Sequence, residues 1–306
     1  NIETGIVGLD TLVKAIKKFD ENTYIHIDNN KAVISDGKKN VTLKTVEYYS
    51  FKDIDFADGN TNIVAGQHIK MAIDKAKKAI SDDTSRPMFQ GIHFNKNYLE
   101  TCDGYRVFQI TLQGTEFDDF TVLPEYIDIL SSIGKKYKTT IEIKRLDKNY
   151  QVNTNIGDLH FTLNGRVLDR QFPDTEKFFY DSNISSILID FDDKSELLNE
   201  VEFMYDVYNS DDNDKKSPLI FDVSRNLFQM TRKGKESGTT TTIQKFEVIK
   251  YEYDENFTMG LNAKYLLEIL KSIDDKHSMH IAIDRKTSPM ILFSENEKYL
   301  IMPIRL

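Results

Sequence analysis

Histidines and one cysteine are the side chains in this chain that could bind a metal or act as a nucleophile. His277 and His280 stand three residues apart at the start of a predicted strand, but no carboxylate partner accompanies them. The other four histidines are scattered over predicted strands, helices and loops: His26, His68, His93 and His160. Cys102 has no evident base beside it, and we expect it to be half-buried. Because catalysis needs convergent polar groups, these residues predict no catalytic site, no metal site and no cofactor.

Two polar loops resemble parts of ligand-binding motifs without completing them. The run at Asp211–Asp214 has the acidic residues of a calcium loop but lacks its glycine and its bidentate glutamate in register. The stretch Lys233–Thr242 reads KGKESGTTTT. Glu236 there occupies the position at which Ser or Thr must follow Gly-Lys in a phosphate-binding loop. We therefore predict a solvated loop at the first stretch and a hairpin tip at the second.

The elements that would have to position such residues form a repeat. Three stretches share the order apolar, polar, apolar, apolar, polar, polar, apolar, which is typical of the buried stripe of an amphipathic helix. They are Val13–Phe19, Ile127–Ile133 and Leu267–Ile273. An alternating strand and a hairpin follow each of them. The hairpin turns are predicted at Asp36-Gly37, Gly157-Asp158 and Glu295-Asn296.

A second kind of unit lies between these copies. His68–Ile80 predicts a helix, with strands near Gly91–Asn95 and Val107–Leu112. Its counterpart begins with a helix at Ser195–Tyr208 and continues with two strands, at Leu219–Val223 and Leu227–Thr231. If the second kind is called A and the first B, the order is B, A, B, A, B. The corresponding ranges are 1–60, 61–121, 122–182, 183–259 and 260–306.

A domain built from one A and one B unit divides the chain into two and a half domains. We predict the second half of one domain at 1–60, a complete domain at 61–182 and another at 183–306. Because the first unit is of type B, we also expect an A unit of about sixty residues upstream of Asn1.

Composition limits the class of protein. The chain has 306 residues, of which 40% are hydrophobic and 29% charged, and no apolar run approaches the roughly 18 to 20 residues of a membrane span. The single cysteine excludes a disulfide framework within one chain and fits a reducing cytoplasm. The net charge of −9 argues against a tight, indiscriminate nucleic-acid binder. It still allows a protein that is acidic outside and basic along one surface.

SRPMFQGIHF (Ser85–Phe94) and LETCDGYRVFQITL (Leu99–Leu112) resemble the second-domain signature of one protein family, the bacterial sliding clamps, which are the beta subunit of DNA polymerase III. RVLDRQFPD (Arg166–Asp174) resembles its linker between the second and third domains. FTMGLNAKYLLEILKSI (Phe257–Ile273) and YLIMPIRL (Tyr299–Leu306) resemble its third domain and C-terminus. The resemblance covers almost the whole chain.

The resemblance implies an α+β DNA clamp fold and a non-catalytic role. Chains of this family have three similar domains and form head-to-tail homodimeric rings around duplex DNA, without sequence specificity. A clamp loader places the ring on DNA, and the ring then keeps the polymerase there. The loader and the alpha subunit of DNA polymerase III are expected partners, through short motifs of roughly Gln-Leu-x-Leu-Phe. The chain departs from the family in lacking the first half of the first domain.

The C-terminal strand is apolar on both faces at Leu300, Ile301 and Met302, and only one face can serve the domain core, so the other face needs a second partner. The resemblance implies that this segment lines the pocket for the short motifs. Position by position, the resemblance implies a peptide pocket with residues from three parts of the chain. They are Phe89, Cys102, Gly104, Tyr105, Arg106 and Val107, then Pro173, Lys177 and Phe178, and finally Asn262, Tyr265, Ser288, Leu300, Met302, Pro303, Ile304 and Arg305.

Lysines on the polar faces of the repeated helices could face the DNA as weak phosphate contacts. They are Lys14, Lys17, Lys18, Lys70, Lys77, Lys78, Lys135, Lys136, Lys264 and Lys271. The alternative is that these lysines only cover solvent-exposed helix faces and do not contact DNA. The helix at 195–208 is acidic at these positions, so the lining is expected to be uneven. The resemblance also implies that the strand edge at 40–45, with Val41 and Leu43, pairs with the third domain of a second copy.

A second hypothesis stays open. The chain could be a clamp-derived interaction protein that keeps the peptide pocket but does not close a ring. The expected missing half-domain is the feature of the sequence that favours it.

Overall fold

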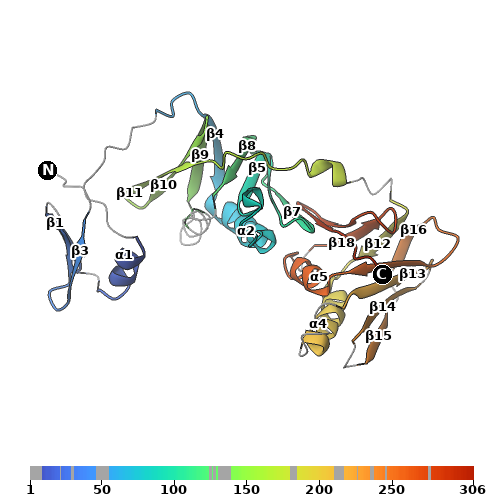
Figure 1. Cartoon of the computed structure of the whole chain (residues 1–306). Coiled ribbons are helices and arrows are strands. Elements are labelled where there is room, and N and C mark those ends of the chain that lie inside the picture. Colours follow the sequence, from blue (N-terminus) through green and yellow to red (C-terminus); the bar gives the residue numbers. More distant parts are fainter. Residues whose placement is uncertain are drawn as a thin grey trace. The chain divides into compact units, whose positions relative to one another are not determined.

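The computed structural model describes most of the chain, namely residues 9–20, 22–28, 31–45, 55–123, 126, 129, 139–179, 185–209, 217–225, 227–234, 238–244, 247–274 and 277–306. These residues form two compact units, Asn1–Asp55 and Phe56–Leu306, called here the N-terminal unit and the main unit (Figure 1). Several predicted features lie outside the described residues: most of the helix at Ile127–Ile133, the acidic run at Asp211–Asp214, and Lys135 and Lys136. The predicted domain boundaries remain a prediction.

The N-terminal unit consists of helix α1 (Leu9–Ile16) and an antiparallel sheet in the order β1 (Tyr24–Asp28), β2 (Lys31–Ser35), β3 (Asn40–Lys44). The turn between β2 and β3 lies at Asp36-Gly37, as predicted. Gly37 has φ +82° there, a backbone conformation that glycine adopts without a steric penalty. The Asp36 carboxylate accepts hydrogen bonds from the backbone amides of Lys38 and Lys39 and thereby closes the turn.

The buried stripe predicted for α1 is wrong in part. Ala15 and Phe19 pack against the sheet, together with Leu12, but Val13 and Ile16 are 39% and 44% exposed. The equivalent positions of helix α5 are buried because α5 packs against a second helix, α4. The described part of the N-terminal unit holds no second helix, so the same sequence pattern leaves two of its apolar side chains uncovered.

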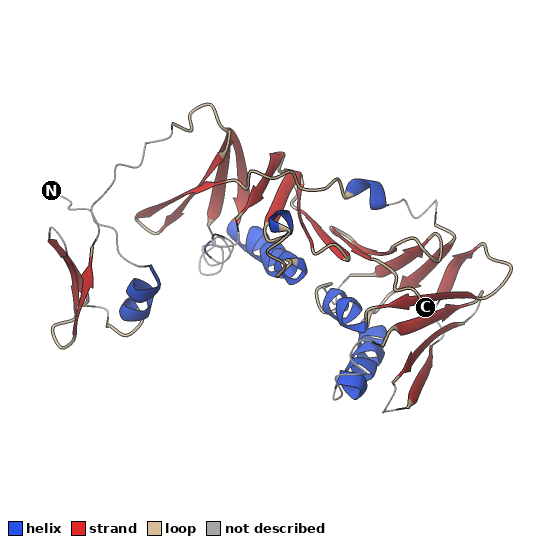
Figure 2. Cartoon of the chain, in the orientation of Figure 1, coloured by secondary structure: helices blue, strands red, loops and turns tan. Residues whose placement is uncertain are grey.

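In its described residues the main unit combines three helices with three antiparallel sheets. Its helices are α2 (Gly66–Ala76), α4 (Ser195–Asn209) and α5 (Ala263–Leu270), with short 3-10 turns at Lys77–Ala79, Pro87–Phe89 and Glu176–Phe178. Figure 2 shows the three helices on one side of the strands. The apolar residues Ile69, Ala72, Ile73 and Ala76 of α2 are buried, whereas Ile80, the last residue of the predicted helix, follows a 3-10 turn and is partly buried. The predicted α+β class is therefore confirmed.

Two of the sheets have four strands each. The first has the order β11 (Leu159–Arg166), β10 (Asn149–Ile156), β9 (Thr140–Leu146), β4 (Asn60–Ala65). The second has the order β15 (Thr239–Gln244), β14 (Phe228–Lys233), β13 (Leu219–Val223), β17 (Phe257–Leu261). The turn between β10 and β11 lies at Gly157-Asp158, as predicted.

The third sheet has nine strands and joins the middle of the chain to its end. Its order is β16 (Glu247–Tyr251), β12 (Ile187–Phe191), β18 (Met279–Ile283), β19 (Met290–Ser294), β20 (Glu297–Ile301), β7 (Arg106–Thr111), β6 (Tyr98–Cys102), β5 (Ile92–Lys96), β8 (Phe117–Val122). The link is the antiparallel pairing of β20 with β7. The turn between β19 and β20 lies at Glu295-Asn296, as predicted. In the described part of the chain no helix is long and apolar enough to cross a membrane.

Strand β6 was not anticipated from the sequence. All five of its residues are buried, and so are the first five of β7. Burial on both faces removes the alternation of apolar and polar residues from which a strand is normally predicted. One face of these strands packs on α2, where the Thr101 hydroxyl donates to the Ala76 carbonyl at 2.6 Å. The other face carries the candidate site.

Candidate functional site

Strand β20 buries both of its apolar faces. Tyr299 and Ile301 point into the main core, and Leu300 points the opposite way into a small separate cluster. That cluster contains Cys102, Val107 and Phe172, and Leu300 is only 2% exposed within it. The face of β20 that does not serve the main core therefore packs against residues from the middle of the same chain.

The cluster belongs to an apolar row that crosses the outer face of the nine-stranded sheet. Residues directly opposite one another on six adjacent strands form this row: Leu188, Ala282, Ile291, Leu300, Val107 and Cys102. Opposed residues of an antiparallel sheet share a face and contact each other. The pairing thus gives the predicted pocket residues Cys102, Val107 and Leu300 one common surface.

The segment 171–179 lies over this surface. Phe172 is 5% exposed and packs on the cluster, and its ring meets the ring of Phe89 edge to face, with centroids 6.2 Å apart. Phe179 also packs against the cluster from its partly buried position. Beside Phe172 the surface opens into a hollow of about 440 Å³ that Phe89, Pro173 and Lys177 line together with Arg86 and Met88. An apolar hollow of this size with a few charged side chains fits the anchor residue of a peptide.

Arg106 connects the site to helix α5. Its guanidinium donates to Asp103 at 2.9 Å, to Glu268, and to the carbonyl of Lys78 at 2.5 Å. It also lies over the ring of Tyr265, 4.2 Å from the centroid. Arg106 is 6% exposed, so these contacts compensate the cost of burying its charge. They also hold Arg106 next to Tyr265, the other predicted pocket residue of this group.

The residues after β20 are fixed by two backbone hydrogen bonds. The Met302 amide donates to the carbonyl of Tyr105 at 2.8 Å, and the Ile304 amide donates to the carbonyl of Gly260 at 2.7 Å. Met302 and Tyr105 remain 37% and 58% exposed. A flexible thioether and an aromatic ring thus stand side by side at the rim of the cluster, where they can adapt to a bound side chain.

The remaining predicted pocket residues are not members of the cluster around Leu300. Asn262 caps α5, since its Oδ1 accepts from the amides of Lys264 and Tyr265. Ser288 lies in the turn between β18 and β19, with its hydroxyl 3.4 Å from Asp284. Gly104 has φ +93° and adjoins the side chain of Arg86, while Phe178, Pro303 and Arg305 lie at the surface. Membership of the pocket remains a prediction for these residues.

Sequence reasoning missed three residues at the centre of the site, Phe172, Phe179 and Met88. Phe172 and Phe179 immediately adjoin the predicted Pro173 and Phe178. Phe172 lies within the RVLDRQFPD stretch, next to the predicted residue Pro173. This position is the feature of the sequence from which its place in the site could have been predicted. Burial of an aromatic ring in an extended segment has no periodicity by which it could be recognised.

A polar row runs parallel to the apolar one, two residues along each strand. Its members are Asp190, His280, Phe293, Lys298, Gln109, Glu100, His93 and Thr121. His93 and Glu100 are 3% and 2% exposed, because the segment 171–179 covers them. The rings of His93 and Phe172 are stacked with centroids 4.5 Å apart and planes 3° apart, and Thr175 donates a hydrogen bond to Glu100.

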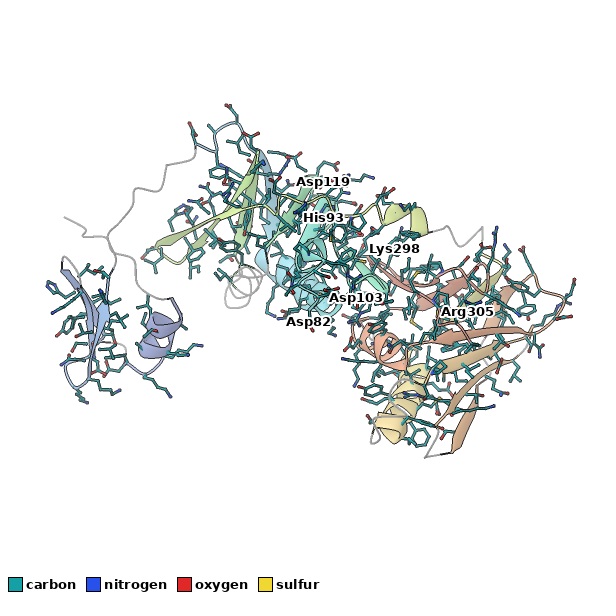
Figure 3. All side chains as sticks on the ribbon, in the orientation of Figure 1. Asp82, His93, Asp103, Asp119, Lys298 and Arg305 are labelled. Atoms are coloured by element: carbon teal, nitrogen blue, oxygen red, sulfur yellow. The ribbon has the colours of Figure 1, made fainter. Side chains whose placement is uncertain are left out.

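Burial disfavours the charged forms of Glu100 and His93 in this covered part of the polar row. It raises the pKa of Glu100 to about 7 and lowers the pKa of His93 to about 4. His93 Nε2 lies 3.8 Å from oxygens of both Glu100 and Asp119, and Figure 3 labels His93 and Asp119 in this region. Its Nδ1 is 3.2 Å from the Thr121 hydroxyl. The groups that hold the segment 171–179 in place are thus titratable.

Two expectations about chemistry-bearing side chains need correction. Cys102 is buried rather than half-buried, at 7% exposure, and burial raises its pKa to about 11, so it is a thiol at neutral pH. His277 lies 2.8 Å from Glu295, and His280 contacts Asp190, so both histidines have carboxylate partners. Among the described residues, no group of three or more His, Cys, Asp or Glu side chains could hold a metal ion.

Several of the lysines predicted to face DNA are engaged within the chain. Lys70 and Lys77 pair with Asp74, Lys271 pairs with Glu202, and Lys264 lies 3.9 Å from Glu268. Lys78 donates to the Ser272 hydroxyl at 2.9 Å. The structure brings Lys70, Lys78 and Lys271 together around one hollow of about 410 Å³ between α2 and the end of α5. Lys14, Lys17 and Lys18 are exposed and form no ion pair within the described part of the chain.

Several strand edges and one helix face are open in the described structure. β3 is an edge strand of the N-terminal sheet, and β15 is an edge strand in the main unit. The predicted edge residues Val41 and Leu43 point into the core of the N-terminal unit, where Leu43 is 8% exposed. The backbone N–H and C=O groups of β3, rather than these side chains, are therefore available for pairing with another strand. On α4, Phe203 and Val207 are 52% and 36% exposed among acidic neighbours.

Comparison with known proteins supports the predicted resemblance. No protein-family model matches the chain. It is 21% identical to the beta sliding clamp of Pseudomonas aeruginosa over 292 residues, which cover 92% of this chain and 76% of the relative. It is 22% identical to the beta sliding clamp of Rickettsia felis over 255 residues, which cover 76% of this chain and 63% of the relative.

Solved structures agree with these relatives. The beta subunit of DNA polymerase III from Thermotoga maritima matches with a TM-score of 0.78 at 19% identity, over 99% of this chain and 81% of that one. The sliding clamp of Bartonella birtlesii bound to griselimycin has a TM-score of 0.78 at 16% identity, over 99% and 83%. The sliding clamp of Bacillus subtilis has a TM-score of 0.76 at 17% identity, over 98% and 79%. The resemblance to bacterial sliding clamps is confirmed, and the chain has their fold.

Proposed function

We propose that this protein is a DNA sliding clamp, a non-catalytic processivity factor of the cytoplasm that encircles duplex DNA and tethers other replication proteins. The observation that carries the proposal is the surface formed by β20, β7 and the segment 171–179. It combines the apolar cluster around Leu300 with an adjoining hollow at Phe89 and Pro173. These are the residues at which the resemblance implies a peptide pocket.

The surface suits a short linear motif of the type Gln-Leu-x-Leu-Phe. Affinity in such interfaces comes from one or two buried apolar anchors, and the hollow beside Phe172 has room for one. Met302 and Tyr105 are exposed next to the cluster around Leu300 and would contact other side chains of the motif. The proposed partners are the alpha subunit of DNA polymerase III and the clamp loader.

A clamp must remain on DNA without gripping it, so topology takes the place of affinity. Extensive contact between lysines and phosphates would make binding tight and steeply salt-dependent. Pairing of Lys70, Lys77, Lys264 and Lys271 with acidic neighbours weakens such contact. A loosely basic lining therefore agrees with a ring that slides.

Ring closure would use the open edges described above. We propose a head-to-tail homodimer in which β3 of one copy pairs with β15 of another, because unpaired strand edges are templates for such pairing. The exposed pair Phe203 and Val207 on α4 would be covered in the same interface.

A clamp-derived interaction protein that does not close a ring is the second candidate. The observation in its favour is the same neutralisation of lysines, because a protein without a DNA-lined hole needs no free basic surface. Retention on DNA separates the two. The full-length protein, loaded by the clamp loader of its organism, should stay on nicked circular DNA and leave when the circle is cut. A protein that binds the motif peptide but is not retained on the circle would contradict the ring and favour the second candidate.

A further inference from the structure

A basic groove adjoins the proposed peptide pocket. It has a volume of about 970 Å³ and is lined by four basic side chains, Arg145, Lys148, Arg166 and Arg170, and by three aspartates. Gln171 lines both this groove and the hollow beside Phe172. The two depressions therefore follow one another along the segment that leads from β11 into the pocket.

The groove is built by fixed backbone. Arg145 comes from β9, Lys148 from the turn between β9 and β10, and Arg166 from the end of β11. The amide of Val167 donates to the carbonyl of Lys148 at 2.9 Å, and the amide of Leu168 donates to the carbonyl of Thr121 at 3.1 Å. These bonds hold the chain leading to Arg170 against the neighbouring strands.

Three arginines of the groove remain available. Lys148 is bound to Asp169 at 2.8 Å, and this contact lowers the pKa of the Asp169 carboxyl. Among the described residues no ion pair joins Arg145, Arg166 or Arg170 to an acidic group. The Nε of Arg145 is moreover buried without a hydrogen-bond partner. A buried N–H group without an acceptor is costly, so Arg145 would be stabilised if its side chain turned to meet an acceptor oxygen in the groove.

We propose that the groove binds acidic residues that flank the motif in partner peptides. This inference rests on the proposed function, since the occupant is the same peptide as it leaves the pocket past Gln171. Arginine guanidinium groups bind carboxylates in a bidentate manner. The aspartates Asp119, Asp147 and Asp169 in the groove favour one or two carboxylates over a nucleic-acid strand, because a strand carries a charge at every phosphate.

The test measures peptide affinity with the full chain by fluorescence polarisation. One labelled peptide carries the motif with neutral glutamine flanks, and two others carry a pair of glutamates before or after it. Binding is compared for the unaltered protein, for the double variant Arg166→Gln/Arg170→Gln, and for Arg225→Gln. Arg225 is an exposed arginine at the turn between β13 and β14 and serves as the matched control.

A pair of glutamates on one flank should tighten binding about tenfold at low salt. The double variant should lose this gain and still bind the neutral peptide unchanged, whereas Arg225→Gln should keep the gain. Equal affinity for acidic and neutral flanks, or an undiminished gain in the double variant, would overturn the inference and leave the pocket standing. A thymidine oligonucleotide that binds better than the acidic peptides, and only when Arg166 and Arg170 are present, would overturn it in favour of nucleic acid. Failure of all three peptides to bind would overturn the proposed function itself.

Discussion

Leu300 on β20 lies directly opposite Val107 on β7, and this pair joins the C-terminal strand to the middle of the chain. Both side chains are buried, at 2% and 4% exposure, on the face of the sheet that points away from the main core. The end of the chain is apolar because it closes a junction, and the same junction forms one wall of the proposed pocket.

Truncation of Leu300 should therefore destabilise the main unit. Leu300→Ala is expected to lower the free energy of unfolding by about 2 to 4 kcal/mol, because it removes a fully buried side chain and leaves a cavity. Leu306→Ala is the matched control, since Leu306 is 63% exposed, and it should change stability by about 0.5 kcal/mol or less. Urea unfolding of the two variants measures the difference. Similar stabilities would show that the junction around Leu300 is not packed as described.

The buried carboxyl of Glu100 predicts a pH dependence. Its pKa rises from 4.5 to about 7 on folding, so the folded protein retains a proton that the unfolded chain has released. Stability from this group is present below about pH 4.5 and is lost as the pH rises through about 7. Glu100→Gln cannot ionise, so relative to the unaltered protein it should gain up to about 3 kcal/mol between about pH 5 and about pH 8.

The control for this effect is Glu176→Gln. Glu176 is partly exposed, and its hydrogen bond with Lys96 lowers its pKa, so it is ionised in both folded and unfolded states over most of that range. The difference in unfolding free energy between Glu176→Gln and the unaltered protein should stay nearly constant across this pH range. His93, whose pKa is lowered, is present in every protein compared, and its loss of stability at low pH cancels. Urea unfolding at the two pH values gives the answer, and a difference for Glu100→Gln that does not change with pH would refute the assignment.

The proposed ring predicts a homodimer for the full-length protein. Sedimentation at micromolar concentration should show a dimer, and Phe203→Asp should weaken it because a charge would enter an apolar contact. Leu159→Asp is the control, since Leu159 is an even more exposed apolar residue, at 73%, at the start of β11. A monomer at this concentration would contradict the ring, and equal effects of the two substitutions would contradict the place of α4 in the interface.

Binding to short linear duplexes should be weak and should fall further with added salt. A ring leaves a linear duplex at its ends, and the available lysines are few. Fluorescence anisotropy of labelled duplexes of different sequence provides the measurement. Nanomolar, sequence-selective binding would indicate a regulator rather than a clamp.

The repeat pattern was enough to predict part of the fold. The stripes of α2 and α5 and all three hairpin turns follow from local periodicity and turn chemistry. Val13 and Ile16 show where this reasoning fails, because burial of a stripe depends on a second helix that the stripe itself does not specify. Strand β6 was missed because burial on both faces leaves no alternation to detect.

The candidate site was predictable only through resemblance. Cys102, Val107 and Leu300 are almost two hundred positions apart at the extremes, and only the register of β20 against β7 and β6 brings them together. Phe172 covers them from an extended segment with no regular pattern. The pairing of Arg106 with Glu268 and of Lys271 with Glu202 likewise depends on tertiary contacts, so charge counts along the helices overstated the free basic surface.

The central claim is that the C-terminal segment forms part of a peptide pocket. Fluorescence polarisation of a labelled Gln-Leu-x-Leu-Phe peptide should give roughly micromolar affinity for the intact protein, which is about −8 kcal/mol. Deletion of Met302–Leu306 should cost about 2 kcal/mol or more of binding, while melting curves and sedimentation show that fold and dimer largely survive. Equal affinity for the intact and the shortened protein would show that the segment only completes a sheet, and would contradict the account.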